Sequence, residues 1–225
     1  MAFDFKKEYK EFYMPKSKPE IVTVPTANYA AVRGKGDPNE KGGAYQKAIG
    51  ILYTVAYTIR MSYKGPHQIE GFYEYVVPPL EGFWSFGEQG SNGEAFGSRG
   101  KEAGEAAVFD KSQFQWISVI RLPDFVTRDD LEWAKQEAGS KKKMDCSSAE
   151  FYTVDEGLCV QIMHIGSYDN EAASIAQMDQ FLFEHGYEYD ISDFRLQHEI
   201  YLSEARRVAP EKWKTVIRHP IRERS

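Results

Sequence analysis

The order of the predicted elements limits the fold more than any other feature, because strand, helix, strand and strand occur twice along the chain. The first set is expected within 20–122 and the second within 157–219. In both sets a strand runs into a glycine turn, Gly34-Lys35-Gly36 or His164-Ile165-Gly166, before an amphipathic helix. Duplicated units of this kind tend to pair about a pseudo-twofold axis. We therefore predict an α+β fold in which two tandem βαββ units form one domain, 20–225, with a central ligand cleft on that axis.

The individual elements follow from hydrophobic periodicity and from breakers such as glycine and proline. Residues 1–19 are expected to form a leader segment, in which Pro15 and Pro19 prevent a continuous helix and aromatic side chains hold the segment to the domain. A Gly- and Ser-rich stretch at 87–104 is expected to be a mobile loop. Strands are predicted at 21–33, 71–77, 113–122, 157–165, 194–203 and 213–218, and helices at 43–60, 128–138 and 169–184.

The predicted strand at 195–202, RLQHEIYL, has two different faces. Strand alternation places Glu199 and Tyr201 on one face, and His198 and Ile200 on the other. The second face is the more apolar, and we expect it to pack on helices. A carboxylate beside a phenol is an uncommon pair for the middle of a strand. The first face therefore either meets solvent or lines a site.

A second carboxylate becomes a candidate when the two halves are superposed. This superposition aligns the predicted strand at 71–77, GFYEYVV, with the strand that carries Glu199. Glu74 then lies opposite Glu199, and the two carboxylates approach the central cleft from either side. The alternative for Glu74 is a solvated surface position, and for Glu199 a structural ion pair with an arginine or a lysine.

Composition narrows the class of partner. Aromatic residues make up 14% of the chain, with 14 Tyr and 14 Phe. Buried tyrosines need partners for their hydroxyls, so some should line a cavity or lie at the surface. The net charge of −6 and the pI near 5.5 argue against a nucleic-acid partner. The sequence has no apolar run long enough for a membrane span and no recognisable signal peptide. We expect a cytoplasmic protein with no membrane partner.

The motifs of several common enzyme classes do not occur in the sequence. Cys146 and Cys159 lack metal-ligand spacing and predict reduced thiols, with Cys159 in a buried strand. There is no GxSxG nucleophile elbow and no HExxH zinc motif, and Gly34-Lys35-Gly36-Asp37 lacks the third glycine of a dinucleotide loop. We expect neither a metal nor a cofactor.

Six short motifs follow one another along the chain: VP at 24–25, GKGDPN at 34–39, PLEGFW at 79–84, RLPDFVT at 121–127, HIGSYD at 164–169 and HEIYL at 198–202. In this order the chain resembles the GyrI-like small-molecule-binding domains over nearly its full length. The resemblance implies tandem βαββ (SHS2-like) units with a ligand cleft between them. It also implies that Glu199, the glutamate of an E-x-Y strand, lies at the floor of an aromatic pocket for planar aromatic or cationic small molecules.

The stand-alone form of the chain is similar to one enzymatic subfamily, the cyclopropanoid cyclopropyl hydrolases. These proteins disarm DNA-alkylating natural products of the yatakemycin and CC-1065 type by adding water to an activated ring. The resemblance thus implies a cofactor-free hydrolase that detoxifies such compounds and gives drug resistance. Two alternatives remain open: a multidrug-binding or sequestering protein without turnover, and a gyrase-inhibitor-like protein.

The expected chemistry assigns roles to particular side chains. A glutamate, Glu199 or Glu74, would orient or deprotonate the water, and Tyr201, Tyr75 or Tyr168 would donate to the dienone oxygen. Aromatic walls would exclude bulk water and stack on a flat ring system. For the tryptophans a core position is the alternative. The candidate catalytic residues are Glu199, Tyr201 and Glu74, and the candidate ligand-binding residues are Tyr73, Tyr75, Trp84, Phe86, Trp116, Phe125 and Tyr168.

Overall fold

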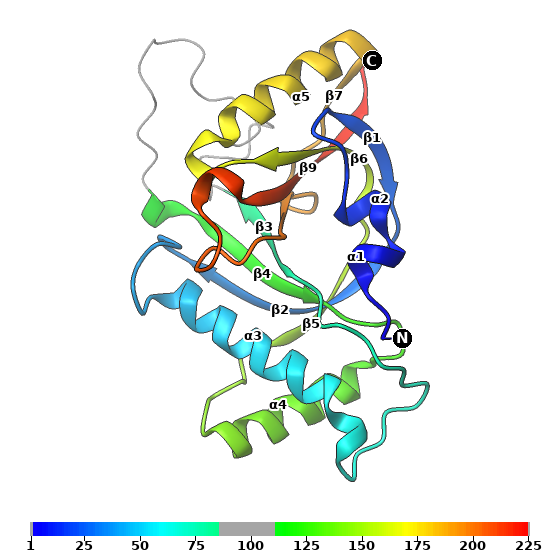
Figure 1. The fold of residues 1–225 in the computed structure, drawn as a ribbon, viewed down its shortest axis with the longest axis vertical. Coiled ribbons are helices and arrows are strands. Elements are labelled where there is room, and N and C mark those ends of the chain that lie inside the picture. Colours follow the sequence, from blue (N-terminus) through cyan, green and yellow to red (C-terminus); the bar gives the residue numbers. More distant parts are fainter. Residues whose placement is uncertain (1, 86–110, 225) are drawn as a thin grey trace.

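The structure, a computed structural model, describes residues 2–85 and 111–224 (Figure 1). Its strands are β1 (Glu20–Val24), β2 (Ala27–Lys35), β3 (Leu80–Ser85), β4 (Gln115–Arg121), β5 (Glu150–Val154), β6 (Gly157–Ile165), β7 (Tyr187–Tyr189), β8 (Gln197–Tyr201) and β9 (Lys214–Glu223). The α-helices are α1 (Phe5–Glu8), α2 (Lys10–Tyr13), α3 (Ala44–Arg60), α4 (Arg128–Lys142) and α5 (Glu171–His185). Short 3₁₀ turns are η1 (Ser62–Lys64), η3 (Lys111–Gln113), η4 (Tyr168–Asn170) and η5 (Pro210–Lys212).

The strands form an antiparallel sheet in the order β1-β6-β9-β8-β3-β4-β2-β5, and β7 pairs with the far part of β9. The predicted α+β fold with two βαββ units is therefore confirmed. Each unit places its first strand at the edge of the other unit: β1 pairs with β6, and β5 pairs with β2. The two units cannot separate without breaking these ladders, which makes them one folded body.

The two long helices α3 and α5 cover one face of the sheet, one helix over each half. Leu52 and Val55 of α3 are buried in a cluster that includes Trp116 of β4. Met178 of α5 packs with Ile217 of β9. Figure 1 shows α3 with its neighbour α4 at one end of the molecule and α5 at the other. Since α3 and α5 each pack over their own half, they lie on either side of the central strands β3 and β8.

The opposite face of the sheet is covered by the N-terminal segment. Phe5, Phe12 and Tyr13 of α1 and α2 are buried in a cluster that contains Ile200 of β8. The prediction that aromatic side chains hold this segment to the body is confirmed for these three residues. The prediction that the Ile200 face packs on helices is confirmed for the two four-residue helices α1 and α2. The long helices α3 and α5 lie on the face of Glu199.

Local sequence signals explain where several helices begin and end. The Thr127 hydroxyl accepts from the Asp130 backbone N–H and the Asp130 carboxylate accepts from the Thr127 N–H, so a capping box starts α4 at Arg128, the predicted first residue of this helix. Gly186 ends α5 in the left-handed conformation, with φ 77°. The start of α5 differs from the prediction, because residues 168–170 form a 3₁₀ turn before it.

The predicted strand at 71–77 is wrong. These residues contribute only one isolated bridge, between Tyr75 and Phe3, and the strand of this region is β3, which begins at Leu80. Pro78 and Pro79 lack the backbone N–H that a ladder requires, which separates the two segments. The aromatic residues of 71–77 pack instead against the N-terminal segment and Phe125. The loop predicted at 87–104 lies outside the described residues.

Candidate functional site

The two halves of the sheet meet at the pairing of β3 with β8. Gly36 and Gly166, both with positive φ, follow β2 and β6 and align the halves. In one half the strand pairs lead from β2 through β4 to β3, and in the other half from β6 through β9 to β8. Followed in this way from the aligned glycines, Gly82 of β3 is equivalent to Glu199 of β8. Gly82 and Glu199 are also direct partners across the two strands. The pseudo-twofold axis therefore passes between them, and the predicted alignment of Glu74 with Glu199 is wrong.

A chain of hydrogen bonds crosses this axis. The Trp84 indole Nε1 donates to the Tyr201 hydroxyl at 2.9 Å, and the Tyr201 hydroxyl donates to Glu199 Oε2 at 2.7 Å. Glycine opposite the glutamate is what permits this geometry. A Cβ atom at Gly82 would lie 2.9 Å from Trp84 Nε1 and 3.3 Å from the Tyr201 hydroxyl. One half of the duplicated fold thus supplies the carboxylate and the other half supplies the space beside it.

Aromatic rings surround this hydrogen-bond chain. The Tyr45 ring, from α3, lies 5.5 Å from the Trp84 ring and 5.1 Å from the Trp116 ring. On the side of α5, the Tyr168 ring lies 5.8 Å from the Tyr201 ring. Tyr168 is 41% exposed, whereas both tryptophans are almost fully buried. Tyr168 and Tyr45 can therefore meet a flat ligand directly, and the tryptophans support the floor beneath it.

The environment makes Glu199 a base suited to neutral pH. Burial raises the pKa of Glu199 to about 7, although the hydrogen bond from Tyr201 and the charge of His198 act in the opposite direction. Part of the Glu199 side chain stays accessible to solvent. A carboxylate whose pKa lies near the working pH is a stronger base than an ordinary glutamate, and about half of it is in the basic form at that pH.

A second carboxyl group, Glu171, lies beside this site. Glu171 begins α5 and is only 4% exposed. Burial and the charges of Glu199 and Asp169 raise the pKa of Glu171 well above its usual range. The site therefore combines two carboxyl groups whose proton affinities have both been increased.

A buried ionic cluster lies on the opposite face of the sheet, directly behind Glu199. His198 Nε2 lies 3.0 Å from Glu81 Oε2, and His198 Nδ1 lies 3.0 Å from Glu156 Oε2. Arg218 Nη1 donates to Glu156 Oε1 at 3.1 Å. Tyr13 donates to Glu81 at 2.8 Å and ties the N-terminal segment to the cluster.

Opposite charges lie next to one another in this cluster. Both ring nitrogens of His198 lie near carboxylate oxygens, which favours the doubly protonated imidazolium. Burial lowers the pKa of His198, but the two carboxylates outweigh it and the net direction is upward. Burial raises the pKa of Glu156, but His198 and Arg218 lower it to about 2. Two anions and two cations thus fix the β3–β8 pair from behind.

The remaining predicted site residues are not assembled with Glu199. Glu74 has a side chain that is 59% exposed and pairs with Arg60 at 3.4 Å. Tyr73 and Phe125 stack edge to face at 4.9 Å, and Tyr75 is buried with Ile200 on the opposite face. Phe86 lies outside the described residues. Of the predicted residues, the structure brings together Glu199, Tyr201, Trp84, Trp116 and Tyr168.

Three residues of the site were not predicted. Tyr45 fits the apolar stripe of its helix, so the sequence gives no reason to treat it differently from a core residue. Gly82 could have been found from its place two residues before Trp84, on the same face of a strand. Glu171 has the composition of an ordinary first helical turn, where acidic residues are common. Only its burial distinguishes it.

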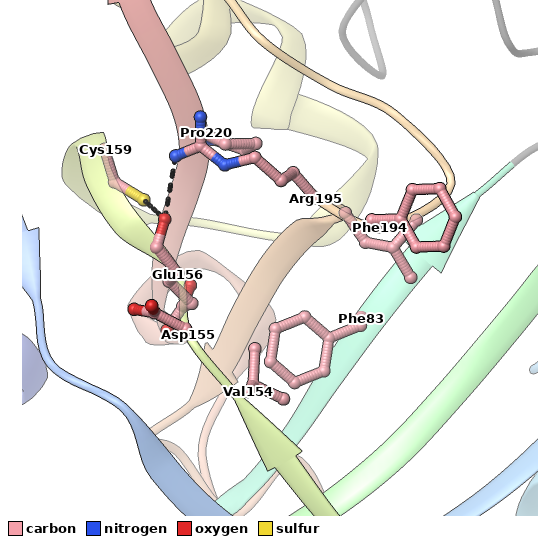
Figure 2. Close-up of a pocket in the computed structure, with 9 residues that line it drawn as sticks. Phe83, Val154, Asp155, Glu156, Cys159, Phe194, Arg195 and Pro220 are labelled. Carbon is pink, nitrogen blue, oxygen red and sulfur yellow. Dashed lines mark hydrogen bonds between the residues drawn. The ribbon is translucent and has the colours of Figure 1, made fainter.

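A separate pocket opens on the face away from Glu199 (Figure 2). Phe83 and Val154 line part of it, and the Arg195 guanidinium donates to the backbone oxygen of Glu156 at 2.8 Å. The Cys159 thiol donates to the same oxygen at 3.6 Å. Burial raises the pKa of Cys159 to about 12, so this thiol is not activated as a nucleophile. These polar groups hold the β5–β6 turn, and the pocket lacks the carboxylate–phenol pair of the first site.

Residues 2–85 and 111–224 contain no cluster of three His, Cys, Asp or Glu side chains able to hold a metal ion. No helix among the same residues has the length and apolar character needed to cross a membrane.

Comparisons with known proteins give the family and the fold of the chain. Residues 121–222 match the model of the GyrI-like small molecule binding domain. A crystal structure of a hydrolase from Listeria innocua is 42% identical to this chain, covers 98% of it and 100% of its own chain, and superposes with a TM-score of 0.84. An uncharacterized conserved protein from the same organism is 43% identical over the same shares, with a TM-score of 0.85.

More distant similarity concerns the fold alone. The EcmrR C-terminal domain superposes with a TM-score of 0.50 at 10% identity, over 92% of this chain and 98% of that domain. A comparison with curated proteins gives no significant match. The full-length similarity at above 40% identity, together with the domain match, assigns the family.

Proposed function

Because the chain belongs to the GyrI-like small-molecule-binding family, we propose that it binds flat aromatic compounds over Glu199 and hydrolyses cyclopropanoid DNA-alkylating compounds among them. The observation that carries the proposal is a carboxylate with a pKa of about 7, hydrogen-bonded to Tyr201 within an aromatic surround. The relative from Listeria innocua that is described as a hydrolase supports the catalytic part of the proposal.

The reaction requires little acid–base strength and accurate placement. A spirocyclopropane conjugated to a dienone is strained, and opening the ring makes the product aromatic. The oxygen of water bonds to the ring CH₂ as the carbon–carbon bond breaks, and the electron pair moves into the ring as a phenolate. Glu199 accepts the proton of the attacking water. Protonation of the phenolate oxygen completes the net addition of one water.

The hydrogen-bond chain defines the part of Tyr201. Its hydroxyl proton is directed at Glu199 Oε2, and its oxygen accepts from Trp84. Tyr201 therefore orients the carboxylate instead of donating to the dienone oxygen, which differs from the role expected from the sequence. Tyr45 and Tyr168 would hold the planar ring system.

The test is the ultraviolet absorbance of a spirocyclopropyl dienone incubated with wild type and with Glu199→Gln. We expect the dienone band to disappear with wild type, the product mass to rise by one water, and the variant to be at least about 100-fold slower. Glu188→Gln, which removes an exposed strand carboxylate paired with Arg222, is the matched control and should behave as wild type. A persistent dienone band with saturable quenching of tryptophan fluorescence would identify a binding protein without turnover and would contradict the proposal.

A further inference from the structure

Glu171 is a buried carboxyl group that the steps above leave unused. Its Oε1 atom has no hydrogen-bond partner within the described part of the chain, and only 4% of the residue is exposed to solvent. An acidic residue in a first helical turn commonly interacts with the helix dipole while its carboxylate stays solvated. Glu171 departs from that pattern because its carboxyl group is withdrawn from solvent. A buried carboxyl oxygen that has no partner among the described residues, beside the candidate site, indicates that a ligand atom could supply that partner.

The groups that face Glu171 are acidic or phenolic. Glu199 and Tyr201 of β8 and Tyr168 and Asp169 of η4 all interact with it electrostatically. Asp169 is exposed, and its carboxylate lies 3.9 Å from Lys111 Nζ. No ion pair to Glu171 occurs among the described residues, so nothing basic there stabilises its ionised form.

His164, which contacts the first turn of α5, makes its hydrogen bonds to groups other than Glu171. His164 of β6 contacts the Ser174 hydroxyl at 2.9 Å and the Ser167 backbone oxygen at 3.0 Å. Burial and the neighbouring carboxylates favour the neutral form of Glu171 and hold its pKa well above its usual range. The protonated form of Glu171, which can donate a proton, is therefore favoured, whereas the pKa of Glu199 is about 7.

We propose that Glu171 is the hydrogen-bond donor and general acid for the carbonyl oxygen of the ligand, while Glu199 is the base that acts on the water. This inference rests on the function proposed above and adds a second catalytic residue and a ligand requirement, namely a carbonyl or phenol oxygen. As the ring opens, the Glu171 proton moves to the former dienone oxygen and the water proton moves to Glu199. Return of the proton from Glu199 to Glu171 through solvent restores the starting state.

Glu171 suits this role better than the phenols. The Tyr201 proton is directed at Glu199. Burial raises the pKa of Tyr168 to about 12, so its hydroxyl is a weaker acid than a carboxylic acid even when that acid is perturbed. Two carboxyl groups with separate proton affinities divide the work of acid and base.

The experiment compares wild type with Glu171→Gln, Glu171→Leu and the matched control Glu184→Gln, which removes an exposed carboxylate of the same helix. In the absence of ligand, infrared spectra at neutral pH should show a carboxylic acid carbonyl band in wild type that is weaker in Glu171→Gln, where the protonated fraction of Glu199 still contributes. In hydrolysis of the dienone, Glu171→Leu should lower kcat/KM by at least about 100-fold. Glu184→Gln should keep the wild-type rate.

The pH profile separates a chemical role from a structural one. Wild-type kcat/KM should fall below about pH 7 as Glu199 gains its proton, and fall again at alkaline pH as Glu171 loses its own. Glu171→Gln keeps a donor that does not ionise, so it should retain partial activity and lose the alkaline fall. A wild-type rate in Glu171→Leu, or a carboxylic acid band that is as strong in Glu171→Gln as in wild type, would overturn the proposal.

The outcome remains decisive if wild type does not open the dienone. That result would refute the hydrolase function. The infrared band and the binding of the ring-opened phenol would then test whether Glu171 is protonated and donates a hydrogen bond to the ligand. Glu171→Leu should bind the phenol at least about tenfold more weakly, the loss of roughly one hydrogen bond to a ligand oxygen. Equal affinity in wild type and Glu171→Leu would overturn the inference.

Discussion

Replacing Glu199 with glutamine should make the folded protein more stable at alkaline pH, although it removes the proposed base. The carboxylate has an ordinary pKa of 4.5 when the chain is unfolded and a pKa of about 7 in the folded protein. Between these values the unfolded chain releases its proton first, so the wild type loses stability as the pH rises from about 4.5 to about 7. The loss is complete above that range and absent below it. Glutamine does not ionise and escapes this penalty.

The size of the effect follows from the two pKa values. Their difference corresponds to about 3 kcal/mol at the full extent of the transition, by the usual conversion of a pKa change to free energy. Glutamine can still accept the Tyr201 hydrogen bond through its amide oxygen, so any change in that bond adds an offset that does not vary with pH. The pH-dependent part of the difference isolates the carboxylate.

The assay is urea unfolding of wild type and Glu199→Gln at pH 5 and pH 8, with the free energies of unfolding compared at each pH. We expect Glu199→Gln to gain about 2–3 kcal/mol over wild type between the two conditions. Glu188→Gln should show no comparable gain, because its carboxylate is exposed. A difference between wild type and Glu199→Gln that is the same at both pH values would refute the argument that burial perturbs this carboxylate.

Two further substitutions test the buried ionic cluster behind Glu199 and the hydrogen bond between Trp84 and Tyr201. Glu156→Gln leaves His198 and Arg218 without a full counter-charge, so urea unfolding should show a loss of about 3–5 kcal/mol; a loss below about 1 kcal/mol would contradict a tightly balanced cluster. Gly82→Ala places a methyl group where the Trp84–Tyr201 hydrogen bond lies, so kcat/KM for the dienone should fall by about tenfold; an unchanged value would show that the bond does not position Glu199.

Local patterns explain why much of the fold could be predicted. The helices α3, α4 and α5 follow from periodicity, the capping box at Thr127 and the left-handed Gly186. The placement of Glu199 and Tyr201 on one face of a strand follows from alternation alone, and the structure confirms it.

The errors arose where long-range packing decided the outcome. Residues 71–77 have the composition of a strand, yet their rings pack against the N-terminal segment and Phe125, and the ladder is formed by β3. Composition could not reveal this choice, and the wrong alignment of Glu74 followed from it. The ionic partners of His198 come from β3 and from the β5–β6 turn, far away in the sequence. Glu171 is conspicuous only through its burial.

The most direct test of the account is a crystal structure of the protein with the ring-opened phenol bound. The account predicts that the planar ligand lies over the Gly82–Glu199 pair, between Tyr45 and Tyr168, with its oxygen directed at Glu171. A ligand found in the pocket beside Arg195, on the other face of the sheet, would contradict the assignment of the site.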